Sequence, residues 1–235
     1  CQLVLPDSRS PTMAPAVDKR LSGRKVAAGA CLDSFGKVAM TLLAACRREG
    51  AETTLHLLQV SNRALSRRQR LEISRTDRRT TIKKGAWGDF RSITSAMAGD
   101  TDVLILGLDG QRSRDALLML AKEWSDPKDR PVLVSAYPGI LFRFALEGML
   151  DRSGADLLCL NSEQDLATYR LGRQALGLSS DNAVVTGLPL LWNAEPSQAK
   201  PDKPSIVFFE QPSIPAHPLQ RRYICKQLKE LAEAW

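Results

Sequence analysis

Polar side chains that could take part in catalysis follow the first apolar run of the chain. Asp33, Ser34 and Lys37 come directly after the run 25–31. An aspartate can act as a general base on a hydroxyl group, while serine and lysine side chains can orient a sugar or hold an anion. The alternative is structural, because Asp33 or Ser34 could cap the next helix and Lys37 could be solvated. We therefore treat Asp33 as a candidate catalytic base, and Ser34 and Lys37 as candidate binding residues.

Two later strand ends carry further candidate binding residues. Tyr137 and Gly139 belong to a Pro-Gly turn after an apolar run, and a glycine there permits a positive φ and close approach of a ligand to the backbone. Asn161 and Ser162 stand at the start of a helix, where side-chain oxygens and free backbone N–H groups favour hydroxyls or anions. Simple capping of the helix is the alternative for this second pair.

The carboxyl-terminal part of the chain adds Gln211 and His217. Both lie in a proline-rich loop between an apolar run and an amphipathic pattern. A histidine changes its protonation state near neutral pH and can serve as a general base. His217 is therefore a second candidate catalytic residue and Gln211 a candidate binding residue, and the alternative is a solvent-exposed loop without a catalytic role.

These residues can act together only if the strands before them end at a common edge. Short apolar runs of strand length alternate with helical patterns, which is typical of βαβ units. The alternation predicts an α/β fold with a doubly wound, mostly parallel Rossmann-like sheet, in which ligands bind outside the carboxyl ends of the strands. The predicted strands are residues 25–31, 53–60, 102–108, 131–136, 155–160 and 182–186.

Apolar residues at helical spacing predict the helices between these strands. Each helix can cover one side of the sheet. The predicted buried positions include Val38, Leu42 and Cys46 in the first helix, and Ala167, Leu171 and Ala175 in the helix after Asn161.

Several cofactor classes lack their sequence signatures. The loop after residue 31 has one glycine instead of G-x-G-x-x-G, and no G-x-x-x-x-G-K-[ST] occurs, which argues against dinucleotide cofactors and P-loop ATPases. The five cysteines are widely spaced without a CxxC pair, and neither His56 nor His217 is near a cysteine pair. We expect reduced, mostly buried cysteines, no metal site and no cofactor.

The net charge of +7 is concentrated in one segment, residues 62–84. This basic segment contains nine basic residues and two acids, so the rest of the chain is neutral overall. It has no interleaved aromatic residues and no nucleic-acid-binding signature, which argues against a nucleic-acid partner. We expect a solvated loop with a short helix, and the alternative is contact with an anionic substrate or an anionic membrane surface.

Composition divides the chain into four segments. We expect a disordered arm over 1–23, a Rossmann-like domain over 24–192, a proline-rich linker over 193–204, and the first strand and helix of a second domain over 205–235. A lone strand and helix bury too little surface to form a domain, so the second domain is expected to be incomplete. Without an apolar stretch of membrane-spanning length or a signal segment, we expect a cytoplasmic protein that could contact the inner face of the membrane peripherally.

Four stretches give the chain a resemblance to a known family. They are Pro131-Val-Leu-Val-Ser-Ala-Tyr-Pro-Gly139, Gly154-Ala-Asp-Leu-Leu-Cys-Leu-Asn-Ser162, Val185-Thr-Gly-Leu-Pro189 and Val207-Phe-Phe-Glu-Gln-Pro-Ser213. In this order they resemble bacterial glycosyltransferases of the GT-B type, over about residues 24–235. By this resemblance the chain corresponds to the amino-terminal domain of such enzymes and the beginning of their carboxyl-terminal domain.

The resemblance implies two Rossmann-like domains that face each other across a cleft. The first would hold a glycan or glycolipid acceptor, and the second a nucleotide-sugar donor. The reaction implied is sugar transfer to a hydroxyl group in surface polysaccharide or glycolipid synthesis, without an essential metal. Most of the donor-binding half would lie beyond residue 235, so the chain alone is expected to be inactive. The resemblance places Asp33, Ser34, Tyr137, Gly139, Asn161 and Ser162 on the acceptor side, and Gln211 and His217 on the other.

Two other functions fit the same pattern. A nucleotide-sugar epimerase can share the two-domain architecture, and a non-catalytic α/β module could bind a glycan or nucleotide without turnover. Sequence downstream of residue 235 would discriminate between them, because a Gly-rich loop followed by an acidic residue for ribose would support the transferase.

Overall fold

The computed structural model describes residues 20–60, 64–97, 99–124, 130–139, 146–192 and 217–234. The chain divides into two compact units, residues 1–194 and 195–235, and each is described by itself. Most of the expected arm and the whole expected linker and strand over 193–210 lie outside the described residues. Residues 20–23, at the end of the expected arm, form a turn whose Leu21 packs against the core, so these four residues are not part of a disordered arm.

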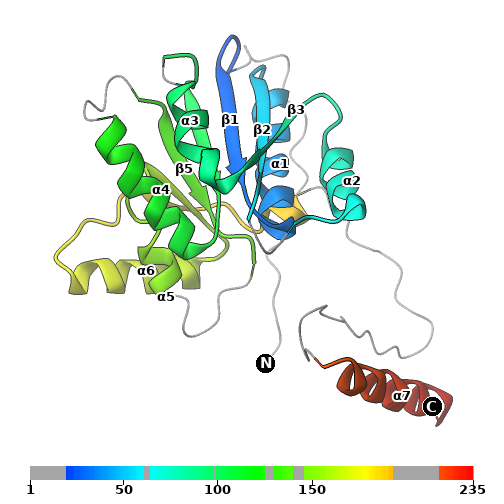
Figure 1. Ribbon diagram of the computed structural model, residues 1–235. Coiled ribbons are helices and arrows are strands. Elements are labelled where there is room, and N and C mark those ends of the chain that lie inside the picture. Colours follow the sequence, from blue (N-terminus) through cyan, green and yellow to red (C-terminus); the bar gives the residue numbers. More distant parts are fainter. Residues whose placement is uncertain are drawn as a thin grey trace, which may run out of the picture. The chain divides into compact units, whose positions relative to one another are not determined.

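The first unit is built on a parallel sheet with strand order β3-β2-β1-β4-β5-β6-β7 (Figure 1). The predicted α/β fold with a doubly wound Rossmann-like sheet is confirmed. All described strand pairs are parallel, where the sequence predicted a mostly parallel sheet. The strands are β1 (Lys25–Ala30), β2 (Glu52–Gln59), β3 (Thr81–Ala86), β4 (Val103–Gly107), β5 (Val132–Ala136), β6 (Leu157–Leu160) and β7 (Ala183–Val185).

Helices cover both faces of this sheet, as the crossovers of a doubly wound fold require. α1 and α2 lie on one face, and α3, α4, α5 and α6 lie on the other (Figure 1). The strand order reverses at β1, which lies between β2 and β4, and such a switch point is where ligands bind in open α/β sheets. The helices are α1 (Asp33–Arg48), α2 (Arg67–Thr76), α3 (Phe90–Ser95), α4 (Gly110–Glu123), α5 (Leu146–Leu150) and α6 (Glu163–Ala175), with 3-10 turns η1 (Trp87–Asp89) and η2 (Pro189–Leu191).

The central strand β1 carries small apolar side chains because both of its faces are buried. Val26 and Ala28 belong to the core under α1, and Ala27 belongs to the core on the opposite face. On that opposite face, a Cβ at Gly29 would come within 3.0 Å of the Phe90 ring at the start of α3. A strand buried on both faces reads as a continuous apolar run, which is why the sequence predicted β1 correctly.

The edge strand β3 was not predicted from the sequence. It begins inside the basic segment and pairs with β2 from Thr54↔Thr81 to Gln59↔Ala86. Its sequence, Thr-Ile-Lys-Lys-Gly-Ala, has one large apolar residue, so its alternation is too weak to separate an edge strand from a solvated loop. The expected short helix of the segment is present as α2.

The buried face of α6 also differs from the prediction. Leu166 and Tyr169 are buried, whereas Leu171 is 68% exposed and its predicted companions Ala167 and Ala175 are exposed as well. The Tyr169 hydroxyl donates a hydrogen bond to Asn182 Oδ1 at 3.0 Å, which connects the helix to the turn before β7. Two rows at helical spacing compete in this helix, and the row with the larger aromatic side chain is buried.

In the second unit, α7 (Pro218–Ala234) confirms the predicted final helix. Leu219 and Tyr223 on this helix are each 64% exposed. Of the described cysteines, Cys31 and Cys159 are buried, Cys46 is partly buried and Cys225 is exposed, where the sequence predicted mostly buried cysteines. Within the described part of the chain, no helix combines the length and apolar character needed to cross a membrane.

Candidate functional site

The parallel sheet brings the predicted site residues of the first unit to one edge. Asp33 follows β1, Tyr137 and Gly139 follow β5, and Asn161 follows β6. The four strands β1, β4, β5 and β6 are consecutive in the sheet, and their carboxyl ends lie at the same edge. The candidate site, called the carboxyl edge below, is therefore a row of loops after these four strands.

Asp33 is held through one of its two carboxylate oxygens. Oδ2 accepts a hydrogen bond from Lys37 Nζ at 3.0 Å, whereas Oδ1 is buried without a hydrogen-bond partner among the described residues. Lys37 Nζ also donates to Glu72 Oε2 on α2 at 2.9 Å. The bond to Glu72 contributes most to raising the pKa of Lys37, and the same bond lowers the pKa of Glu72. Lys37 is thus a cation held between two carboxylates, and it fixes the orientation of the Asp33 side chain.

The backbone before Asp33 is in a conformation that residues other than glycine rarely adopt. Leu32 has φ 68° and ψ 164°, and such strain is typical of functional sites. Leu32 is the N-cap of α1 and no side chain caps this helix end, so the capping alternative for Asp33 and Ser34 is wrong. Asp33 is the first helical residue, where its carboxylate meets the positive end of the helix dipole.

A buried arginine joins three segments of the carboxyl edge. Arg152 is 1% exposed, and its guanidinium donates to the carbonyl of Leu108 at 2.6 Å and to the carbonyl of Gly148. The guanidinium carbon lies 4.7 Å from the centre of the Tyr137 ring and 5.8 Å from that of Phe35. Burial lowers the pKa of this group, and Tyr137 and nearby acids oppose the effect. Arg152 therefore braces the first turn of α1 and the loops after β4 and β5 against one another.

Asp109 and Arg112 form a second polar group, at the start of α4. Asp109 is the N-cap of this helix: Oδ1 accepts from the Arg112 N–H at 3.1 Å, and Oδ2 pairs with the Arg112 guanidinium. Burial raises the pKa of the adjacent Cys31 thiol to about 12, while the charge of Arg112 lowers it and that of Asp109 raises it. Cys31 is therefore a neutral core residue and not an activated nucleophile.

Asn161 connects the loop after β6 to the turn after β5. Its Nδ2 donates to the Gly139 carbonyl, and its Oδ1 is buried without a partner in the described ranges. Gly139 does not adopt a positive φ, which corrects the reason that the sequence suggested for a glycine here. A Cβ at this position would meet nothing within 4 Å. The connection between the two loops thus depends on the Asn161 amide.

The other predicted site residues have simpler surroundings. Ser162 is the N-cap of α6, where its hydroxyl accepts a backbone N–H bond at 3.2 Å, as the capping alternative predicted. Ser34 is exposed in the first turn of α1. In the second unit, His217 is exposed and its Nδ1 accepts from the Leu219 N–H at 3.3 Å, while Gln211 lies outside the described residues.

Sequence reasoning missed Arg152, although it connects the loops of the site. It follows α5 without a motif around it, and an arginine is normally expected at the surface. Asp109 did have a signal, because it directly follows the predicted strand 102–108, much as Asp33 follows the predicted strand 25–31 after one residue.

Unsatisfied buried polar atoms are concentrated at the carboxyl edge. In the described part of the chain, six buried side-chain atoms lack hydrogen-bond partners, and four of them are at this edge: Asp33 Oδ1, Arg112 Nε, Arg152 Nε and Asn161 Oδ1. The other two are Ser135 Oγ on β5 and Trp124 Nε1 at the end of α4. Buried polar groups are normally hydrogen-bonded, so the unpartnered oxygens of Asp33 and Asn161 mark a place where a ligand can supply partners. The two oxygens can accept hydrogen bonds from hydroxyl groups. No group of three or more His, Cys, Asp or Glu side chains able to hold a metal occurs among the described residues.

The parallel sheet, its switch point at β1 and the polar carboxyl edge define a Rossmann-like α/β protein. The model of one protein family, described as "Putative glycosyltransferase (DUF6716)", matches residues 26–235. The chain belongs to this family, which confirms the resemblance to glycosyltransferases. Among curated proteins, none matches the sequence.

Solved structures with related arrangements include proteins of several activities. LpCGTa, solved in complex with UDP, has a TM-score of 0.47 and 12% identity, over 70% of this chain and 52% of that chain. A ribokinase-like superfamily protein from Enterococcus faecalis V583 has a TM-score of 0.41 and 14% identity, over 75% and 61% of the two chains. Cj0485 dehydrogenase has a TM-score of 0.35 and 9% identity, over 71% of this chain and 68% of that chain. The chain thus spans about half the length of LpCGTa. Similarity at this level carries no functional conclusion.

Proposed function

We propose that this chain carries the acceptor side of a GT-B glycosyltransferase. The enzyme transfers a sugar from a nucleotide-sugar donor to a hydroxyl group of a glycan or glycolipid, in surface polysaccharide or glycolipid synthesis. Membership of a glycosyltransferase family supports the class of reaction. The site is supported above all by the hydrogen bonding of Asp33. Lys37 donates to one oxygen of its carboxylate, and the other oxygen is buried without a partner in the described part of the chain.

In this proposal Asp33 acts as the general base. The acceptor hydroxyl binds at Oδ1 and gives its proton to the carboxylate while its oxygen forms a bond to the anomeric carbon of the donor sugar. The bond between that carbon and the donor phosphate breaks, and its electron pair leaves on the phosphate oxygen. Lys37 keeps Oδ2 occupied and so directs the acceptor to Oδ1. A positioned base of this kind contributes roughly 10²–10⁴-fold to the rate.

The neighbouring loops bind the rest of the acceptor. Asn161 Oδ1 accepts a hydrogen bond from a second acceptor hydroxyl, and the turn of Tyr137 and Gly139 forms the adjoining surface. Arg152 is buried, so it acts as a positioning residue that keeps Tyr137 in place and does not touch the acceptor. Ser162 and Ser34 have minor roles in this scheme, as a helix cap and an exposed rim residue.

The second unit belongs to the donor side in this proposal. Residues 205–235 would begin a second Rossmann-like domain, and Gln211 and His217 would border the cleft from that side. In this proposal Nε2 of His217 would contact a substrate, because Nδ1 already accepts the hydrogen bond from the Leu219 N–H.

The reaction is tested by incubating the full-length protein with UDP-, GDP- and ADP-sugars, with and without glycolipid acceptors. Chromatography then measures nucleoside diphosphate release and the sugar product. We expect release of the nucleoside diphosphate that increases when an acceptor is added. Recovery of an isomerised nucleotide-sugar without release would instead identify an epimerase. Saturable binding without turnover would identify a non-catalytic module, and either result overturns the proposal.

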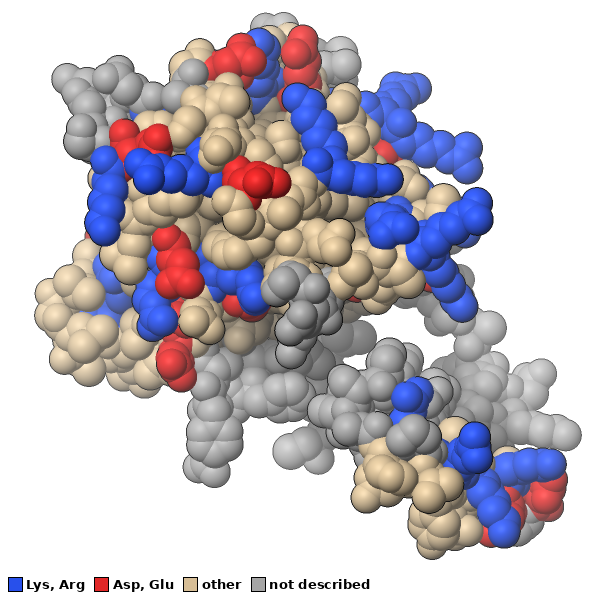
Figure 2. Space-filling model, in the orientation of Figure 1, with Lys and Arg blue, Asp and Glu red and all other residues tan. Residues whose placement is uncertain are grey.

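We further propose that the basic segment contacts an anionic membrane surface and so brings a glycolipid acceptor to the enzyme. Figure 2 shows Lys and Arg side chains gathered over α2 and β3. The two acids of the segment are engaged in ion pairs, Glu72 with Lys37 and Asp77 with Arg47. The outward-facing charge of the segment is therefore positive.

This membrane contact is tested by sedimentation with phosphatidylglycerol vesicles, with phosphatidylcholine vesicles as reference. Replacing Arg67, Arg75 and Arg78 by glutamine should weaken binding by about a hundredfold, since each basic residue near such a surface contributes roughly 1 kcal/mol. All three are exposed. A matched triple change of Arg48, Lys122 and Arg170, outside the segment, should leave most of the binding intact. Equal losses in the two triple variants would contradict a specific surface.

A further inference from the structure

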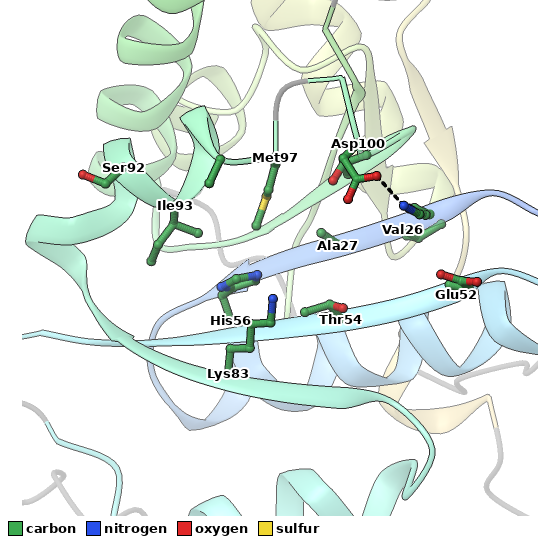
Figure 3. Close-up of a pocket in the computed structure, with 13 residues that line it drawn as sticks. Val26, Ala27, Glu52, Thr54, His56, Lys83, Ser92, Ile93, Met97 and Asp100 are labelled. Carbon is green, nitrogen blue, oxygen red and sulfur yellow. Dashed lines mark hydrogen bonds and ion pairs between the residues drawn. The ribbon is translucent and has the colours of Figure 1, made fainter.

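A cavity of about 470 Å³ lies on the sheet face opposite α1, apart from the carboxyl edge (Figure 3). Its floor consists of Ala27 on β1, Thr54 and His56 on β2, and Lys83 on β3. Residues two apart along a strand share a face, and Leu55, between Thr54 and His56, packs into the core under α1. The polar residues of β2 therefore occupy positions that a helix would normally cover in a doubly wound sheet.

The cavity exists because α3 is too short to cover this face. α3 has 6 residues and β2 has 8, so the helix is about 9 Å long beside a strand of about 26 Å. Phe90 of α3 packs over Gly29, toward the carboxyl end of β1. The amino-terminal half of the face stays open, with Ile93 and Met97 as its apolar wall.

The charges around the cavity are separated into two ends. His56 and Lys83 are direct partners in the register of β2 and β3, and both face the cavity (Figure 3). At the other end Lys25 forms an ion pair with Asp100, close to Glu52. Within the described residues, no carboxylate pairs with Lys83. Burial and, second, the Lys83 charge lower the pKa of His56, which favours the neutral imidazole. The positive charge at this end of the cavity is therefore that of Lys83, and an anion would offset it.

We propose that this cavity binds a small organic anion, a carboxylate or a phosphate ester with an apolar body. The anionic group contacts Lys83, His56 and the Thr54 hydroxyl, and the apolar body packs against Ile93 and Met97. The ligand carries its charge at one end only, because Glu52 would repel a second anionic group. The cavity volume is within the range of small-molecule sites. This site is built on strand faces, so it does not depend on the proposed transferase activity.

The two histidines of the chain allow a direct test by proton NMR. His56 reports on the cavity, and His217 in the second unit is an internal reference. Phenyl phosphate and benzoate are titrated as probes, with benzyl alcohol as the neutral analogue and inorganic phosphate as the anion without an apolar body. We expect a saturable shift of the His56 signal with phenyl phosphate or benzoate, and a rise in the pKa of His56, because a bound anion stabilises the imidazolium. The His217 signal should not move.

Two matched lysine variants distinguish binding in the cavity from a general effect of positive charge on the strand. Lys83→Met should weaken the affinity for phenyl phosphate by about tenfold or more, since it removes a charge-assisted hydrogen bond. Lys84→Met, on the opposite face of the same strand, should leave the affinity unchanged. Thr54→Val should weaken it less than Lys83→Met. The proposal is overturned if His56 and His217 shift in parallel, if benzyl alcohol or inorganic phosphate binds as tightly as phenyl phosphate, or if the two lysine variants behave alike.

Discussion

The centre of the sheet and its β2–β3 edge place charge against an apolar core in different ways. At the centre, Arg152 is buried and its guanidinium contacts backbone carbonyls and two aromatic rings. At the β2–β3 edge, charge stays near the surface: Lys83 on β3 is exposed, and an open cavity lies beside His56 and Lys83. The centre therefore holds its site loops rigidly, whereas the edge keeps accessible charge for binding.

The largest expected effect concerns the centre. Arg152→Met should lower the free energy of unfolding by about 3 kcal/mol, because the carbonyls of Leu108 and Gly148 lose a charged donor inside the protein. Urea unfolding followed by circular dichroism measures the change. Arg170→Met, at an exposed position of α6, is the control and should have little effect. Equal stabilities of the two variants would contradict the bracing role of Arg152.

A smaller effect is expected where α2 and β3 are attached to α1. The Asp77 carboxylate, 4% exposed, accepts from Arg47 at 2.6 Å and from the Thr80 hydroxyl at 2.9 Å. Asp77→Asn should lower the free energy of unfolding by about 2 kcal/mol at pH 7, since it removes a charge-assisted bond and leaves Arg47 unpaired.

The effect of Asp77 should also depend on pH. Burial alone would raise the pKa of Asp77, but hydrogen bonds from Arg47, the Arg79 N–H and Thr80 outweigh burial and lower it. A carboxylate with a lowered folded-state pKa stabilises the protein above the unfolded value, about pH 4, and loses this contribution as the pH falls through the folded value. Urea unfolding at pH 7 and pH 3 should show the Asp77→Asn difference shrinking at the lower pH. An identical difference at both would contradict this attachment.

The smallest expected effect distinguishes two helix starts at the carboxyl edge. Ser162→Ala should cost about 1 kcal/mol, because the Ser162 hydroxyl caps α6. Ser34→Ala should change stability much less, because Leu32 and not Ser34 is the N-cap of α1. Thermal unfolding of both variants measures the comparison. A loss at Ser34 as large as that at Ser162 would contradict the uncapped start of α1.

The sequence was most informative where strands are buried on both faces. β1 and β4 are continuous apolar runs, and the residues after them follow from the rule that parallel strands end at a common edge. Asp33, Tyr137 and Asn161 could therefore be predicted to share an edge. Their roles in catalysis and binding stay predictions.

Features that depend on contacts between distant segments could not be predicted. β3 is a strand because it pairs with β2, and its own residues do not indicate this. The burial of Arg152 depends on Phe35, Leu108 and Tyr137, which are far away in the sequence. The cavity beside His56 depends on the length of α3, and element boundaries are the least reliable part of any sequence-based prediction.

The most direct test of the central claim is the kcat of sugar transfer by the Asp33→Asn variant of the full-length protein. We expect kcat to fall by about 10²–10⁴-fold, the contribution of a positioned base. The unfolding midpoint should fall only slightly, because the ion pair with Lys37 and the helix dipole each contribute at most about 1 kcal/mol. Asp115→Asn, an exposed acid on α4, should keep the wild-type kcat. An Asp33→Asn kcat within about threefold of wild type would be too small a loss for a general base and would contradict the account.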